Sequence, residues 1–238
     1  MSKTQLTSEN AVTTLDKLYT AVIQGIPGIS KPIEQFAEDY LLKNKDVKSA
    51  VNSMIKNQLI KCTTTGIATG FGGLLTLPVT LPADLSSSLY MQMRMIACTA
   101  HMNGYDIHSD QVKTLVYACL VGLSAGNVVK QFGVKAGVQF AKAGIKKIPG
   151  KILTKINQKV GFRFLTKFGT KGLVNIGKLI PIVGAGISGG LNYAETKIIA
   201  KRAYKNFVEG DFSEGEKIDI TLAETNDGEV IDTEIVEE

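Results

Sequence analysis

Residues 147–171 read KIPGKILTKINQKVGFRFLTKFGTK, in which a basic side chain recurs every four residues beside a track of Ile, Val and Phe. They belong to a longer run, residues 111–194, that contains thirteen Lys or Arg and no Asp or Glu. This pattern predicts a helix with a basic and an apolar face, although a four-residue step drifts about 40° around a helix, so one face is kept only over three or four steps. The basic residues are Lys147, Lys151, Lys155, Lys159, Arg163, Lys167 and Lys171.

Two structures fit this basic segment. In the first, the helix lies at a membrane interface, where Ile and Phe enter the lipid and the lysines contact anionic headgroups. In the second, the apolar track packs into a protein core, and the lysine stems cover apolar surface while their charges stay in water. Because no acidic residue lies near the lysines in the sequence, both interpretations stay open.

Glycines mark the rest of the run. We expect a helix that begins after Ser109 and extends into the 140s, either continuous or with a break. At about 100° per residue, five glycines of this helix share a sector of roughly 60°. Glycine costs a helix about 1 kcal/mol relative to alanine, so this face indicates close approach by another helix, either in a soluble core or in a membrane-type interface. These packing glycines are Gly122, Gly126, Gly133, Gly137 and Gly144, with Gly186 and Gly190 further on.

Two uncharged segments flank this region, residues 62–83 and residues 179–194. The first is long enough to span a bilayer, but its many Gly, Pro and Thr residues favour a buried hairpin or a shallow interfacial segment. The second is short for a span, and we expect the two to pack together as a helical hairpin.

The remaining patterns predict an all-α protein, a single multi-helix domain with Gly-rich apolar central helices and a disordered acidic C-terminal tail. Amphipathic helices are expected over 8–24, after Pro32, after Asp46 and over 84–102. We divide the chain into an N-terminal helical extension (1–44), a main helical domain (45–208) and the tail (209–238). Arg94 lies alone in an apolar helix, and Asp84 or Asp106 is its candidate partner.

The net charge of +5 conceals an uneven distribution. Residues 62–205 carry eighteen basic and four acidic side chains, whereas residues 206–238 carry twelve acids and one lysine. Such asymmetry indicates a polyanionic partner. Three cysteines without a disulfide pattern favour a reducing compartment, and the first residues lack a secretion signal. No catalytic motif, metal-ligand cluster or cofactor fingerprint is present, so we expect neither an enzyme nor a cofactor or metal site.

Several short motifs resemble the EcsC family of bacterial proteins: Leu-Pro-Ala-Asp-Leu at 81–85, Met-Arg-Met-Ile at 93–96, Asn-Gly-Tyr-Asp at 103–106 and Ile-Pro-Ile-Val-Gly-Ala-Gly-Ile at 180–187. The resemblance covers about residues 45–208. It implies a mostly helical, often membrane-associated protein with no agreed enzymatic activity and no catalytic residues to carry over. Its motif residues, expected to be structural, are Pro82, Asp84, Arg94, Gly104, Tyr105 and Asp106.

Together these features favour a non-enzymatic, membrane-associated helical protein that docks on the anionic cytoplasmic membrane surface, with a role in transport, envelope or defence processes. Its expected partners are anionic membrane lipid and either a membrane protein or a second copy in a homo-oligomer. It would be cytoplasmic, peripheral or partly inserted at the inner membrane. The alternatives are a pore- or lesion-forming membrane effector and a soluble protein-interaction module. A nucleic-acid partner is disfavoured, because few aromatic residues interleave with the lysines.

Overall fold

The computed structural model describes residues 8–63, 83–131, 138–168 and 186–218, and within them almost all regular structure is helical. The all-α expectation is confirmed. Apart from the helices, two short strands, β1 (Leu123–Ser124) and β2 (Glu216–Lys217), pair in parallel. The α-helices are α1 (Ser8–Gln24), α2 (Ile33–Leu41), α3 (Val47–Thr63), α5 (Ala83–Met102), α6 (Asp110–Val121), α7 (Gly126–Gln131), α8 (Val138–Ile145), α9 (Gly150–Phe168) and α11 (Gly186–Tyr204), and a π-helical turn, η2 (Lys205–Glu209), follows α11.

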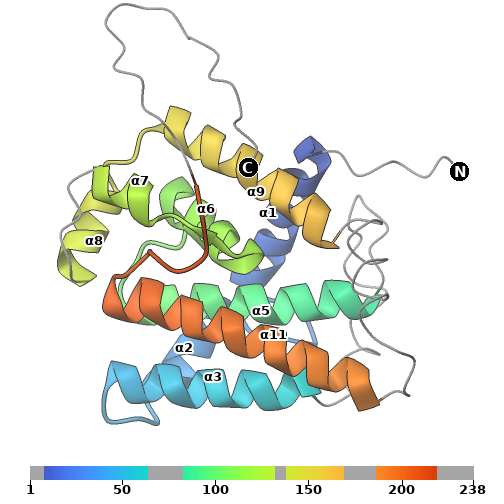
Figure 1. The fold of residues 1–238 in the computed structure, drawn as a ribbon. Coiled ribbons are helices and arrows are strands. Elements are labelled where there is room, and N and C mark those ends of the chain that lie inside the picture. The colour runs from blue at the N-terminus through green and yellow to red at the C-terminus, as the bar shows by residue number, and fades with distance from the viewer. Residues whose placement is uncertain (1–7, 64–82, 132–137, 169–185, 219–238) are drawn as a thin grey trace, which may run out of the picture.

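Helix α5 forms the centre of the molecule (Figure 1). It contacts α1, α2, α3, α6 and α11, and every residue from Leu89 to Ala100 is buried. Helices α2 and α3 lie below α5 in the view of Figure 1, whereas α1, α6 and α9 lie above it. An unbroken run of buried residues requires neighbours on all sides, so α5 is a core helix rather than a surface helix.

The N-terminal helices belong to the same core as the rest of the described chain. Leu15 and Val22 of α1 and Ile33 of α2 are fully buried in the shared hydrophobic cluster. Gly25 ends α1 with a φ of +74°, and the carboxylate of Asp46 caps α3 by accepting the backbone N–H of Ser49 at 2.8 Å. The boundary expected at residue 44 therefore does not separate two packing units.

The stretch from residue 110 into the 140s, expected as a helix that is continuous or has a break, forms the separate helices α6, α7 and α8 in the described residues. Ser109 caps α6 as expected, accepting from the N–H of Val112 at 3.3 Å, but α6 ends at Val121 because Gly122 adopts a φ of +91°. Gly126 then begins α7, and Gly144 lies buried in α8. Gly133 and Gly137 lie outside the described residues. Hydrogen bonds from residues 216 and 218 to the backbone of 122–124 favour the end of α6 at this point. Helical periodicity in the sequence cannot predict such contacts, because they come from a distant part of the chain.

The two uncharged segments are only partly described. Helix α11 runs without interruption through residues 186–204, and Gly186 and Gly190 lie in its first turns. The hairpin expected from 62–83 and 179–194 falls mostly outside the described residues. Within the described ranges, no helix is both long and apolar enough to cross a membrane.

Residues 210–218, which we call the C-terminal strap, pack on the helical body. Gly210 ends η2 with a φ of +73°, Phe212 is buried edge-on against Phe207 at a centroid distance of 5.5 Å, and Ile218 is buried. The backbone N–H groups of Glu216 and Ile218 donate to the carbonyls of Gly122 and Ser124. For residues 210–218 the expectation of a disordered tail was therefore wrong, and residues 219–238 lie outside the description.

Candidate anion-binding surface

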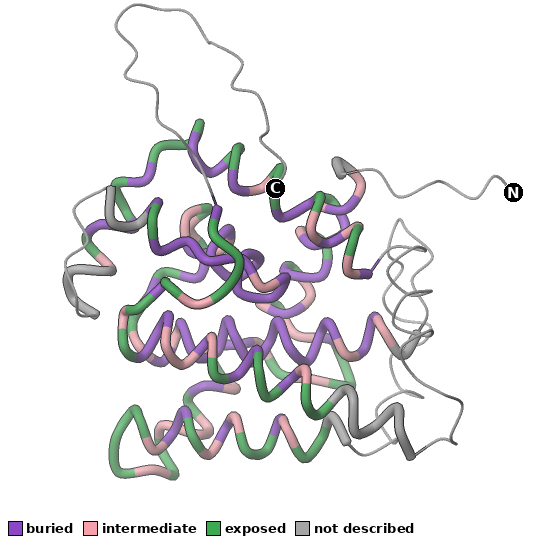
Figure 2. Tube along the Cα trace, viewed as in Figure 1, coloured by how far each residue is buried: buried purple, intermediate pink, exposed green. Residues whose placement is uncertain are grey.

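Helix α9 carries most of the basic segment and rests on α1 and α6. Its apolar track is buried against these helices, as the alternation of buried and exposed stretches along α9 in Figure 2 shows. In this fold the track is core, so the helix does not present an apolar face for insertion into lipid. The interpretation of a packed helix with a solvated basic face is the one that the structure supports. The buried residues are Ile152, Leu153, Ile156, Val160, Gly161, Phe164 and Phe168.

The opposite face of α9 points to solvent. At about 100° per residue, Lys151, Lys155, Lys159 and Phe162 share a sector of roughly 80°, and all four are exposed. Phe162 lies between the lysines in angle and is 62% exposed, which is unusual for a large aromatic side chain. Lys146 and Lys147, in the turn before α9, are also exposed. We define the α9 basic face as Lys146, Lys147, Lys151, Lys155, Lys159 and Phe162.

None of the lysines of the α9 basic face forms an ion pair with any residue in the described ranges. The other exposed residues between Lys146 and Lys159 are neutral, namely Pro149, Gly150, Thr154 and Gln158. Five positive charges on about 20 Å of helix and turn, without a described counter-charge, form a surface suited to a polyanion.

The last members of the expected lysine series behave differently. Arg163 Nη2 lies 2.9 Å from Glu216 Oε2 in the C-terminal strap, and Lys167 Nζ lies 2.8 Å from Glu195 Oε1 in α11. Lys171 lies outside the described residues. The structure therefore separates the series into an unpaired part, residues 147–159, and a paired part at 163 and 167.

Arg94 has a different partner from those expected. Its guanidinium is buried and donates to the carbonyls of Val22 at 3.3 Å and Lys31 at 2.6 Å, while Cζ lies 4.3 Å from the centroid of the Phe36 ring. Since the Val22 carbonyl belongs to the last turn of α1, the positive charge sits at the negative end of that helix dipole. Backbone carbonyls thus take the place of the expected carboxylate partner, and no contact with Asp106 occurs in the described structure, while the side chain of Asp84 lies outside the description.

Arg202 repeats this arrangement at the end of α6. Its Nη1 donates to the carbonyl of Cys119 at 3.1 Å, in the last turn of the helix. Two of the arginines in the acid-poor middle of the chain thus compensate their charge at helix C-termini rather than with carboxylates. An excess of basic residues in the sequence therefore does not by itself predict an exposed basic surface, because some of these charges are compensated within the fold.

The remaining family-motif residues build the turn from α5 to α6. Gly104 adopts a φ of +75°, Tyr105 packs edge-on against Phe207 at 5.2 Å, and the Asp106 carboxylate accepts the N–H of His108 at 3.1 Å. Asp84 lies in the first turn of α5, and Pro82 lies outside the described residues. These contacts are structural, and they do not bring Arg94 together with the turn.

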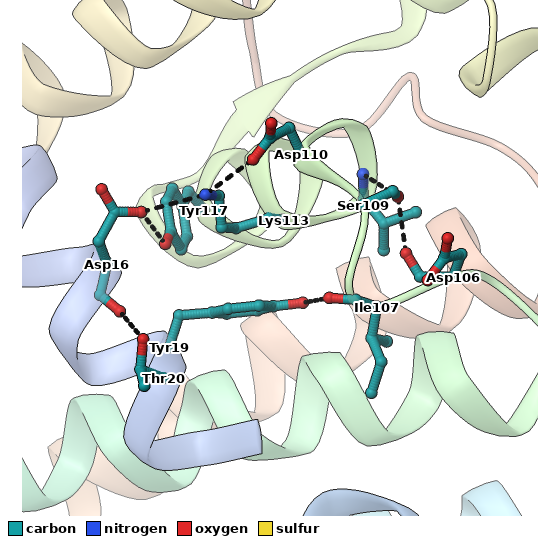
Figure 3. Close-up of polar contacts among 10 residues, drawn as sticks. Asp16, Tyr19, Thr20, Asp106, Ile107, Ser109, Asp110, Lys113 and Tyr117 are labelled. Carbon is teal, nitrogen blue, oxygen red and sulfur yellow. Dashed lines mark hydrogen bonds and ion pairs between the residues drawn. The ribbon is translucent and has the colours of Figure 1, made fainter. Parts of the chain in front are cut away.

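A polar cluster that the sequence analysis missed joins α1 to α6 (Figure 3). The Tyr117 hydroxyl donates to Asp16 at 2.7 Å, and Lys113 Nζ lies 3.5 Å from Asp16 and 2.9 Å from Asp110. Tyr19 lies edge-on to Tyr117 at 5.6 Å. No local sequence signal could have revealed these contacts, since α1 and α6 are about a hundred residues apart. The cluster fixes the two helices on which α9 rests.

Burial keeps the phenols of this cluster protonated. Burial, together with the nearby Asp16 carboxylate, raises the pKa of Tyr117 well above its usual value, and burial and Asp106 do the same for Tyr19. Both phenols therefore remain neutral hydrogen-bond donors. Burial also raises the pKa of Cys98 and of Cys119 to about 12, which disfavours the nucleophilic thiolate. Among the described residues, no three His, Cys, Asp or Glu side chains are grouped as metal ligands.

The fold and its basic surface define a single-domain, all-helical protein whose most distinctive described exterior feature is a cationic helix face. Comparison with protein families matches residues 3–208 to the EcsC protein family, so the chain belongs to this family. The match starts well before residue 45, in agreement with the packing of α1 and α2 into the shared core. Comparison with curated proteins and with solved structures gives no match.

Proposed function

We propose that this protein is a non-enzymatic peripheral membrane protein that docks on the anionic cytoplasmic leaflet through the α9 basic face. The observation that carries the proposal is the exposure of five lysines around one exposed phenylalanine, with no ion-pair partner in the described ranges. Supporting it is the complete absence of acidic residues from 111 to 194, which contains the whole of α9.

The physical basis is electrostatic attraction supplemented by one apolar contact. A lysine near an anionic membrane surface contributes about 1 kcal/mol, and the effect decays within a Debye length of about 8 Å at physiological salt. The lysines of one helix face can meet such a surface together. Phe162, at the C-terminal end of the face, adds an aromatic ring that can enter the headgroup region. Because the apolar track of α9 is core, we propose docking on the surface rather than insertion of this helix.

An anionic membrane fits the α9 basic face better than a nucleic acid does, because the face contains a single aromatic residue and no nucleic-acid motif. A membrane accepts lysines at any spacing on one face, whereas a strand-binding surface stacks successive bases on several aromatic rings.

The decisive experiment is co-flotation with vesicles of phosphatidylglycerol and phosphatidylcholine, compared with phosphatidylcholine alone. The test variant combines Lys151→Gln, Lys155→Gln and Lys159→Gln. The matched control combines Lys43→Gln, Lys45→Gln and Lys48→Gln, which removes the same charge from exposed lysines at the turn between α2 and α3. This turn lies at the opposite end of the molecule from α9 (Figure 1).

We expect the test variant to lose about 100-fold in vesicle partitioning, since three lysines at about 1 kcal/mol each contribute about 3 kcal/mol. The control should stay within about threefold of the unaltered protein. Equal losses in both triple variants would show that only net charge matters, and equal binding to neutral and anionic vesicles would refute the proposal.

Phe162→Ser tests the apolar contribution separately. It leaves the charge unchanged and removes an exposed ring, so folding should be unaffected while vesicle binding weakens several-fold. Unchanged binding would limit the interaction to electrostatics.

A further inference from the structure

The route of the C-terminal strap points toward α9. Glu214 Oε1 pairs with Lys201 at 3.0 Å and with Lys205 at 2.8 Å, which holds the strap on α11 and η2. The β1–β2 pairing then holds residues 216–217 against residues 123–124. The strap consequently has a fixed course over the body of the protein.

The end of the strap lies beside the basic series of α9. Glu216 Oε2 is 2.9 Å from Arg163 Nη2, so a carboxylate of the C-terminal region already occupies one position of that series. Two residues later, Ile218 is buried and its N–H donates to the Ser124 carbonyl at 3.3 Å. The chain that follows Ile218 therefore begins two residues after the contact between Glu216 and Arg163, and Arg163 lies one helical turn from Lys159 on α9.

The sequence that follows has the complementary charge. Residues 219–238 contain eight acidic side chains and no basic one: Asp219, Glu224, Asp227, Glu229, Asp232, Glu234, Glu237 and Glu238. The α9 basic face offers five lysines. No other stretch of this length in the chain combines so many acids with no base.

The length is sufficient for the two to meet. Twenty residues reach about 65 Å when fully extended, and a flexible chain of that length spans about 25 Å on average. Helix α9, with nineteen residues, is about 28 Å long. Tethering at residue 218 gives the acids an effective concentration in the millimolar range near the lysines, which compensates for the screening of a weak charge interaction.

We propose that residues 219–238 bind the α9 basic face in the free protein and are displaced when an anionic membrane takes their place. The binding of residues 219–238 to the α9 basic face depends only on their attachment at residue 218 and on the complementary charges. Their displacement by a membrane rests on the proposed function. Such an intramolecular contact reduces the apparent affinity for the membrane to the intrinsic affinity multiplied by the fraction of molecules whose face is free.

The first test needs no lipid. A carbodiimide couples a lysine amine directly to a carboxylate in contact with it, and peptide mapping then identifies the pair. In the full chain at physiological salt we expect couplings from residues 224–238 to Lys151, Lys155 and Lys159, and their suppression at about 1 M salt, where the Debye length is about 3 Å. Their absence, or equal coupling to Lys43, Lys45 and Lys48, would overturn the proposal even if the protein binds vesicles.

The second test measures competition. A full-length variant with all eight acids of 219–238 changed to Asn or Gln should bind anionic vesicles about five- to tenfold more tightly, the gain expected when a tethered competitor at millimolar effective concentration is removed. In the Lys151→Gln, Lys155→Gln, Lys159→Gln background the same neutralisation should change binding less than twofold. An equal gain in both backgrounds would mean that only overall charge acts and would overturn the proposal. If no variant binds vesicles, the coupling experiment still decides whether the acids occupy the face.

Discussion

Arg163 of α9 and Glu216 of β2 form an ion pair with an Nη2–Oε2 distance of 2.9 Å. The pair joins the basic helix to the acidic end of the chain, although no acidic residue occurs between 111 and 194. It also separates the unpaired lysines of α9 from the positions whose charges are compensated within the described fold. The C-terminal strap is therefore part of the surface that α9 presents.

The strap depends on Gly215. Its φ is +126°, and an added Cβ would lie 2.6 Å from the Gly122 carbonyl oxygen and 2.8 Å from the Leu123 carbonyl carbon. Because these are backbone atoms, Gly215→Ala should dislodge the strap at a cost of about 1–3 kcal/mol. The measurement is hydrogen exchange of the Glu216 and Ile218 amides, whose protection should fall by about 5- to 100-fold.

The control for this substitution is Gly150→Ala. A Cβ at Gly150, the first residue of α9, would have no neighbour within 4 Å. It should leave the protection of Glu216 and Ile218 unchanged. Full protection of both amides in Gly215→Ala would show that the strap tolerates the added methyl group.

Arg94 should be essential for stability. Arg94→Met removes the donors to the carbonyls of Val22 and Lys31 and the contact with Phe36, all in a buried site. Leaving such carbonyls without donors should lower the free energy of unfolding by about 2–4 kcal/mol, as measured by urea denaturation. Arg163→Gln, which breaks a surface ion pair, should cost less than about 1 kcal/mol. Equal losses would contradict the assignment of Arg94 as a buried helix cap.

Stability should decrease at alkaline pH. Burial is the main reason why the pKa of Tyr19, Tyr105 and Tyr117 lies above the usual value of 10.0 in the folded protein. Below pH 10 these phenols are neutral in both states, whereas above it the unfolded chain loses protons that the folded chain retains. The free energy of unfolding should therefore fall above pH 10, by up to about 1.4 kcal/mol per pH unit for each group.

Urea titrations between pH 8 and pH 11 would measure this fall. Tyr117→Phe should make the fall above pH 10 less steep without abolishing it, because one shifted phenol is removed while Tyr19, Tyr105 and the buried thiols of Cys98 and Cys119 keep their raised pKa values. A free energy of unfolding that stays constant to pH 11 would disprove the prediction.

The buried cysteines should be unreactive in the folded protein. Cys98 and Cys119 have no exposed surface, and burial raises the pKa of each to about 12. In a Cys62→Ser variant, which leaves only these two thiols, a disulfide reagent at pH 8 should react about 100-fold or more slowly than with the urea-unfolded chain. Rapid labelling without denaturant would show that the core opens locally around α5 or α6.

The sequence by itself determined the helical class and most helix starts. Ser109 and Asp46 cap helices where they were expected to, since a cap is a local interaction between a side chain and N–H groups two or three residues away. The family membership also follows from the sequence, because short motifs such as Gly104-Tyr105-Asp106 encode a turn with a positive φ and a buried ring.

Only the tertiary structure decided which charges remain available. Arg94 and Arg202 donate to carbonyls in the last turns of α1 and α6, which are distant from them in the sequence. Arg163 and Lys167 form ion pairs with acidic residues of β2 and α11. It also decided that Gly122 ends a helix, because the strap supplies hydrogen bonds to the 122–124 backbone. Periodicity predicts which residues share a helix face, but the neighbour that covers a face comes from another part of the chain. For α9 that neighbour is α1 and α6 on one side, and the lysines of the other side are left to solvent.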